Sequence, residues 1–158
     1  MQLHLFEQVG EVVRAMVPAE LGAYQQRTHR RGLKVWFGSA DKPRRDHFEA
    51  QIIAYRHLDT DQPQPEGRFA IEIGFHAEFG DPAKNQQALD QVLKAKKSWK
   101  NVLGTSPEAG EFLGNSDWRR LSEVWMDVEP DEPELAFEVA SRLVDYIESV
   151  QPQLDVVT

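Results

Sequence analysis

The chain contains no cysteine. Disulfide bridges, thiolate zinc ligands and a cysteine nucleophile are therefore excluded, so a bound metal ion could be held only by histidine and carboxylate side chains. The sequence also has no apolar run long enough to cross a bilayer, and residues 1–7 lack the basic head and long apolar stretch of a signal peptide. We therefore expect a cytoplasmic protein that has no membrane partner.

Known catalytic motifs are also missing. The loop 104–114 contains glycine, serine and threonine, but it lacks the lysine and hydroxyl residue that end a phosphate-binding P-loop. No Gly-x-Ser-x-Gly nucleophile elbow occurs. A nuclease centre of the Glu-x-Lys kind is not matched either, because glycine stands two residues after Glu72. These absences favour a binding domain over an enzyme.

The length and composition are those of one globular domain. With 158 residues, 41% of them hydrophobic, the chain is expected to form a single domain, 1–158, around one core. Most tryptophans of so small a domain belong to the core, although they could instead line an aromatic pocket. The four tryptophans are Trp36, Trp99, Trp118 and Trp125.

The charge is acidic overall and unevenly distributed. A formal net charge of −8 disfavours nucleic acid as a partner, because a polyanion is bound by local positive charge. Basic residues nevertheless concentrate between Arg27 and Arg45, whereas 129–138 is acidic. An ordinary solvated surface is the simpler interpretation of the basic segment, and a phosphate-binding patch is the alternative. The candidate anion-binding residues are Arg30, Arg31, Arg44 and Arg45.

Hydrophobic periodicity predicts a mixture of helices and strands. Apolar residues at three- and four-residue steps indicate helices at 6–24, 81–104 and 131–152, with Pro18 and Pro152 near helix ends. Alternating or β-rich segments indicate strands at 33–38, 47–55, 68–79 and 118–128. Short links between strands favour antiparallel pairing. The sequence thus predicts an α+β domain in the order α-β-β-β-α-β-α, with an antiparallel sheet of about four strands and helices packed on one face.

The clearest strand, 68–79, alternates between apolar side chains on one face and mostly polar ones on the other. Imidazole and carboxylate groups recur on the polar face, and those of 47–55 could face them if the two strands pair in that register. Such a group suits a zinc or manganese ion, or general acid and base work. The alternative is a sheet face open to water that carries cross-strand polar pairs. The candidate residues are His47, Glu49, Glu72, His76 and Glu78.

Several pieces of 68–146 match a family pattern. They are the strand 69–73, Asn85 at a helix start, the run 89–99, the Leu103-Gly104 stop, Arg119-Arg120-Leu121 before the next strand, and the terminal helix. In these pieces the chain resembles a prokaryotic domain of unknown function that is found alone or appended to restriction-modification and related nucleic-acid proteins. The resemblance implies a role near nucleic-acid metabolism or host defence, and it brings no catalytic residues.

Two interpretations of function remain. The leading one is a non-catalytic binding or interaction domain, for which homodimerisation and a link to nucleic-acid metabolism are the expected contexts. The alternative is a metal-dependent hydrolase, in which the carboxylates bind the ion and a histidine transfers a proton. That alternative requires the histidines and glutamates to meet around a concavity of the fold. A small-ligand cavity between sheet and helices is a third possibility.

Overall fold

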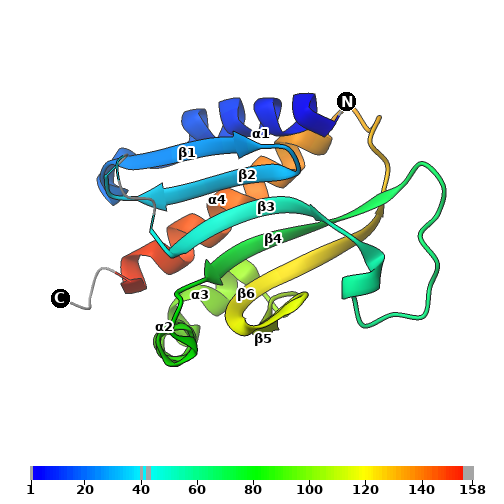
Figure 1. The fold of residues 1–158 in the computed structure, drawn as a ribbon. Coiled ribbons are helices and arrows are strands. Elements are labelled where there is room, and N and C mark those ends of the chain that lie inside the picture. The colour runs from blue at the N-terminus through cyan, green and yellow to red at the C-terminus, as the bar shows by residue number, and fades with distance from the viewer. Residues whose placement is uncertain (1, 40, 42–43, 155–158) are drawn as a thin grey trace.

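The computed structural model describes residues 2–39, 41 and 44–154, which form one antiparallel sheet with α-helices (Figure 1). The predicted single domain 1–158 also includes 1, 40, 42–43 and 155–158, which lie outside this description. The sheet has six strands in the order β1-β2-β3-β4-β6-β5. The strands are β1 (Tyr24–His29), β2 (Gly32–Phe37), β3 (Asp46–Ile53), β4 (Phe69–Ala77), β5 (Glu108–Phe112) and β6 (Asn115–Val128).

The helices lie against one face of this sheet. They are α1 (Gln2–Met16), α2 (Pro82–Lys94), α3 (Lys96–Leu103) and α4 (Leu135–Leu154), with short 3-10 turns η1 (Ala19–Leu21) and η2 (Tyr55–His57). Figure 1 shows α4 running behind the strands, where it contacts β3 and β4, and α1 packs on α4, β1 and β2. The main hydrophobic core fills the space between the helices and the sheet, with Phe6, Phe48, Ile73 and Leu143 fully or almost fully buried. The predicted α+β class is therefore confirmed.

The predicted number and order of elements were wrong, because the sheet has six strands rather than about four. The two missed strands, β1 and β5, form the edges of the sheet, and most of their residues are partly or fully exposed. Neither has a clear alternation of apolar and polar residues, since each is held mainly by backbone pairing with one neighbour. Because both faces of such an edge strand are largely exposed to water, its apolar and polar residues do not alternate, and periodicity alone did not reveal it.

Several predicted helix limits also differ. The first helix ends at Met16, and the rest of the predicted interval 6–24 is loop except for η1 and the first residue of β1. The interval 81–104 is divided at Ala95 into α2 and α3. The last helix continues past Pro152 to Leu154, since a proline in the final turn removes a hydrogen bond only near the helix end. In the described ranges no helix is long and apolar enough to cross a membrane.

Strand β4 lies in the middle of the sheet and has the predicted alternation. Its apolar residues, among them Ile71, Ile73 and Phe75, belong to the core beneath the helices. Its polar residues Glu72 and His76 lie on the other face and have an exposed fraction of 0%. This part of the polar face is therefore not open to water. A solvated sheet face, the alternative considered from the sequence, does not explain why polar residues stand here.

Gly74 allows β4 to lie against β6. Its φ of +156° is one that residues with a side chain rarely adopt, and a Cβ placed there would lie 2.4 Å from the carbonyl oxygen of Leu121. The same Cβ would approach the Cα and Cβ of Ser122 to 2.6 Å. Because Gly74 stands between Glu72 and His76, this close approach also fixes the position of the polar face.

We expect Gly74→Ala to lower the free energy of unfolding by about 2–4 kcal/mol, because the new methyl group meets rigid backbone and the φ angle becomes strained. Gly80→Ala is the matched control, since nothing lies within 4 Å of a Cβ at Gly80. The control should change the free energy of unfolding by less than about 0.5 kcal/mol. Urea denaturation followed by circular dichroism measures both. Equal losses in the two variants would show that the β4–β6 approach is not tight.

Candidate metal centre

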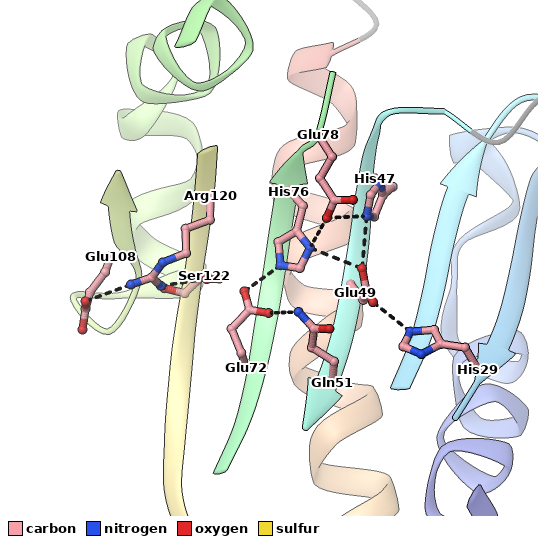
Figure 2. Close-up of polar contacts among 10 residues, drawn as sticks. All are labelled: His29, His47, Glu49, Gln51, Glu72, His76, Glu78, Glu108, Arg120 and Ser122. Carbon is pink, nitrogen blue, oxygen red and sulfur yellow. Dashed lines mark hydrogen bonds and ion pairs between the residues drawn. The ribbon is translucent and has the colours of Figure 1, made fainter. Parts of the chain in front are cut away.

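The pairing of β3 with β4 brings the two halves of the polar cluster together. His47 lies opposite His76, and Glu49 lies opposite Gly74. Glu78 follows the end of β4, and its backbone N–H donates to the carbonyl oxygen of Arg45 at 2.7 Å. This bond continues the hydrogen-bond ladder between β3 and β4 by one residue. Figure 2 shows these side chains on the face of the sheet that is turned away from α4.

Four ligand-type atoms converge: His47 Nε2, Glu49 Oε1, His76 Nδ1 and Glu78 Oε2. All of them lie within 4.8 Å of one another. The distances from His47 Nε2 to the Glu49 and Glu78 oxygens are 3.1 and 3.4 Å, and those from His76 Nδ1 are 3.4 and 3.3 Å. Ligands of a tetrahedral zinc ion, each at about 2.0–2.1 Å from the metal, are about 3.3–3.4 Å apart. The four distances between imidazole nitrogens and carboxylate oxygens are therefore close to this spacing.

The cluster is buried, and in the part of the chain that the structure describes two of its nitrogens, His47 Nδ1 and His76 Nδ1, lack a hydrogen bond. Both imidazoles have an exposed fraction of 0%, whereas the side chains of Glu49 and Glu78 keep 11% and 15%. His76 Nδ1 points at both carboxylates but forms no hydrogen bond with any group in the described part of the chain. Buried nitrogen lone pairs and carboxylate oxygens repel one another unless a proton or a cation lies between them. The arrangement therefore requires positive charge at its centre.

A second layer of side chains orients the cluster. Glu72 Oε2 lies 2.6 Å from His76 Nε2, and Gln51 Nε2 donates to Glu72 Oε1 at 3.1 Å. A proton on His76 Nε2 is held by Glu72, which directs the Nδ1 lone pair toward the centre. On the other side, His29 Nε2 contacts Glu49 Oε2 at 2.8 Å. Glu72 was grouped with the candidate ligands from the sequence, but its contact is with the outer nitrogen of His76.

The pKa values express the same balance of charge in the metal-free protein. Burial raises the pKa of Glu49, but the adjacent imidazoles of His29, His47 and His76 hold it far below its ordinary value. Burial acts the same way on Glu78, yet the two imidazoles beside it lower its pKa to about 2. Burial lowers the pKa of His76, but the charge of Glu72, its hydrogen bond to His76, and the nearby carboxylates of Glu49 and Glu78 raise it well above its ordinary value. Without a metal ion, a proton on His76 supplies the positive charge.

Aromatic side chains from the β5–β6 hairpin cover part of the cluster. The ring of Phe112 meets the His76 ring edge to face with centroids 4.7 Å apart, and Trp118 meets Phe112 at 5.5 Å. The sequence reading missed Phe112 and His29, because both belong to edge strands that it did not find. Neither residue lies in a segment of alternating apolar and polar residues. They could have been found only by pairing their segments with the predicted strands beside them.

Beyond β4, the buried guanidinium of Arg120 belongs to a separate group. Arg120 donates to the hydroxyl of Ser122 at 2.8 Å and pairs with Glu108 at 3.2 Å (Figure 2). Its neighbour in the sheet is His76, but its side chain contacts Glu108 of β5 and Ser122 of β6. It therefore tightens the β5–β6 hairpin rather than the histidine and glutamate cluster.

The candidate anion-binding arginines do not form one patch. Arg30 and Arg31 lie in the turn before β2, and the first residue of β2 pairs with a residue near the end of β3. Arg44 and Arg45 instead precede the start of β3. The length of β3, roughly 20 Å, separates the two pairs. Arg44 is also held by the carboxylate of Asp46 through two contacts of 2.8 and 3.0 Å. The basic segment is thus divided between two ends of the sheet.

Comparison of the chain with protein-family models, with curated proteins and with solved structures gives no match. The resemblance of 68–146 to a domain found with restriction-modification proteins stays a prediction.

We expect the contribution of this cluster to the free energy of unfolding of the metal-free protein to be greatest between about pH 4.5 and 6.5. The raised pKa of His76 gives stability that is complete below 6.5 and is lost as the pH rises through the folded-state pKa. The lowered pKa of Glu78 gives stability that is complete above 4.5 and is lost as the pH falls toward about 2. Urea denaturation of chelator-treated protein across this range measures the effect.

His76→Gln is the comparison variant for this pH dependence. It should lose the alkaline decline that wild type shows, because no group at this position then releases a proton. Parallel curves for wild type and His76→Gln above pH 6.5 would contradict the assignment of this decline to His76.

Proposed function

We propose that this protein binds one divalent transition-metal ion, zinc by preference, through His47, Glu49, His76 and Glu78. The observation that carries the proposal is the nitrogen His76 Nδ1, which is buried, lacks a hydrogen bond in the described part of the chain, and faces two carboxylate oxygens at 3.3–3.4 Å. A divalent cation would balance the two carboxylates and accept both imidazole lone pairs. It would act in place of the proton on His76.

The donor set supports zinc over calcium or magnesium. Calcium and magnesium prefer six or more oxygen ligands, whereas neutral imidazole nitrogens suit zinc and other transition metals. The chain offers two nitrogens and two oxygens, with each nitrogen 3.1–3.4 Å from each oxygen. Manganese also binds carboxylate and imidazole, but it usually takes more than four ligands. Zinc is therefore the ion that we expect to bind most tightly.

A binding or structural role is favoured over hydrolysis. Structural zinc sites are closed by four protein ligands, whereas catalytic sites keep one position open for water or substrate. Here two imidazoles and two carboxylates would supply four protein ligands, and both imidazoles are fully buried. The ion would join β3 to β4 and to the segment after β4, and so stabilise the fold. This supports the binding domain that the sequence favours over the metal-dependent hydrolase.

The direct test is metal binding by the double variant His76→Gln with Glu78→Gln. The control is His4→Gln with Glu7→Gln, which alters another histidine–glutamate pair, 3.7 Å apart but exposed on α1. We expect one zinc ion per chain in wild type and in the control, and none in the site variant, measured by calorimetry and by metal analysis after dialysis. Zinc at one hundred times its Kd should raise the free energy of unfolding of wild type by about 2.7 kcal/mol.

Titrations with manganese and calcium complete this experiment. We expect manganese to bind more weakly than zinc, and calcium to leave the stability unchanged. The proposal fails if wild type binds no zinc, or if the site variant binds zinc as tightly as the control does. Circular dichroism of each metal-free variant shows whether the fold is retained.

We expect Glu72→Gln to weaken zinc binding by about 10–100-fold while the stoichiometry stays at one ion per chain. The amide keeps the size of the side chain but loses the negative charge that holds the outer nitrogen of His76 in place. Glu66→Gln, in the exposed loop before β4, is the control and should leave the affinity unchanged. An unchanged affinity in Glu72→Gln would show that Glu72 does not position the ligand.

A further inference from the structure

A second candidate site lies on the same face of the sheet, between the end of β3, η2 and the β5–β6 hairpin. It is a cavity of about 320 Å³. Basic side chains line one part of it and apolar side chains line another. The lining residues that carry the argument are Arg31, Arg56, His57, Phe112, Leu113 and Trp118. We infer that this cavity binds a small aromatic anion, a planar ring that bears one carboxylate or phosphate group.

The charge of the cavity supports an anionic ligand. Arg31 and Arg56 both line it, and no Asp or Glu is among the described residues of its wall. In the part of the chain that the structure describes, neither guanidinium forms an ion pair with a carboxylate. Guanidinium groups bind carboxylate and phosphate through two parallel hydrogen bonds. Two such groups without acidic partners therefore favour the uptake of an anion.

The apolar part supports a ring on that anion. Phe112 and Trp118 stand edge to face, with centroids 5.5 Å apart and an angle of 76° between their planes. Phe112 also meets the buried ring of His76, with centroids 4.7 Å apart, and Leu113 packs against the small cluster of Ile53 and its neighbours. Buried side chains therefore hold the apolar wall of the cavity in place, as a preformed binding site requires.

Gly114 shapes the edge of the cavity beside His57. It has a φ of +85°, and a Cβ there would lie 3.0 Å from His57 Nδ1. Glycine thus permits both the turn and the close approach of the imidazole. The volume of about 320 Å³ is near the lower end for small-molecule sites, so it suits one ring and its charged group rather than a nucleic-acid strand.

This inference does not depend on the proposed metal ion. The cavity is lined by Arg31, Arg56 and Trp118, none of which belongs to the four proposed ligands. The experiments therefore use chelator-treated protein throughout. Failure of metal binding and failure of ligand binding are then separate results.

The test is a titration followed by nuclear magnetic resonance of the tryptophan indole N–H groups. Trp118→Phe assigns the signal that reports on the cavity. The probes are benzoate, phenyl phosphate, benzyl alcohol as the uncharged ring, and inorganic phosphate as the charge without a ring. We expect saturable shifts of the Trp118 signal with benzoate or phenyl phosphate, at lower concentrations than with either of the other two. The stronger of the two aromatic anions identifies the preferred charged group.

Two double variants with the same change in net charge decide the role of the arginines. Arg31→Gln with Arg56→Gln should raise the Kd of the better aromatic anion about tenfold or more, because charge-assisted hydrogen bonds are lost. Arg30→Gln with Arg45→Gln should leave the Kd unchanged, since neither residue lines the cavity. Equal effects in the two variants, equal binding of benzyl alcohol, or no saturable shift with any probe would overturn the inference.

Discussion

The antiparallel register of β3 and β4 is the constraint on which the polar cluster depends. His47 meets His76 because Phe48 and Phe75, the next pair, point to the opposite face and enter the core. A shift of one residue along either strand would exchange the faces and place an imidazole among the helices. The hydrophobic core on one face therefore fixes the positions of the polar atoms on the other face.

The burial of that polar face makes a positive charge at its centre necessary. Glu49, Glu72 and Glu78 are three carboxylates within one small region, and Glu72 is fully buried. Isolated charges of this kind are expensive to bury, so each is paired with an imidazole or an amide. A proton on His76 can meet this need, and so can a divalent metal ion. The metal ion meets it more completely because it carries two charges and accepts four ligands.

The sequence predicted those parts of the fold that carry a burial pattern. Strand β4 alternates clearly, and its two faces were assigned correctly, as was the α+β class. The edge strand β1 has six residues, none fully buried, so its pattern held no information about pairing. The same lack hid β5 and the aromatic ring that it places on His76.

For the candidate cluster, residue types and spacing were sufficient to select the members, and the structure brings them together. The role of each residue in the cluster could be assigned only from the structure. Only the ring orientation of His76 shows that Nε2 faces Glu72 while Nδ1 faces Glu49 and Glu78. The separation of the arginines likewise depends on which end of β3 each pair adjoins, and that follows from strand order.

The most direct measurement is the crystal structure of zinc-loaded protein, with diffraction data recorded on both sides of the zinc absorption edge. The account predicts one strong anomalous peak per chain, about 2.0–2.1 Å from His47 Nε2, His76 Nδ1 and an oxygen each of Glu49 and Glu78. A peak elsewhere on the surface, or a cluster that keeps its direct histidine–glutamate contacts with no peak in saturating zinc, would contradict it.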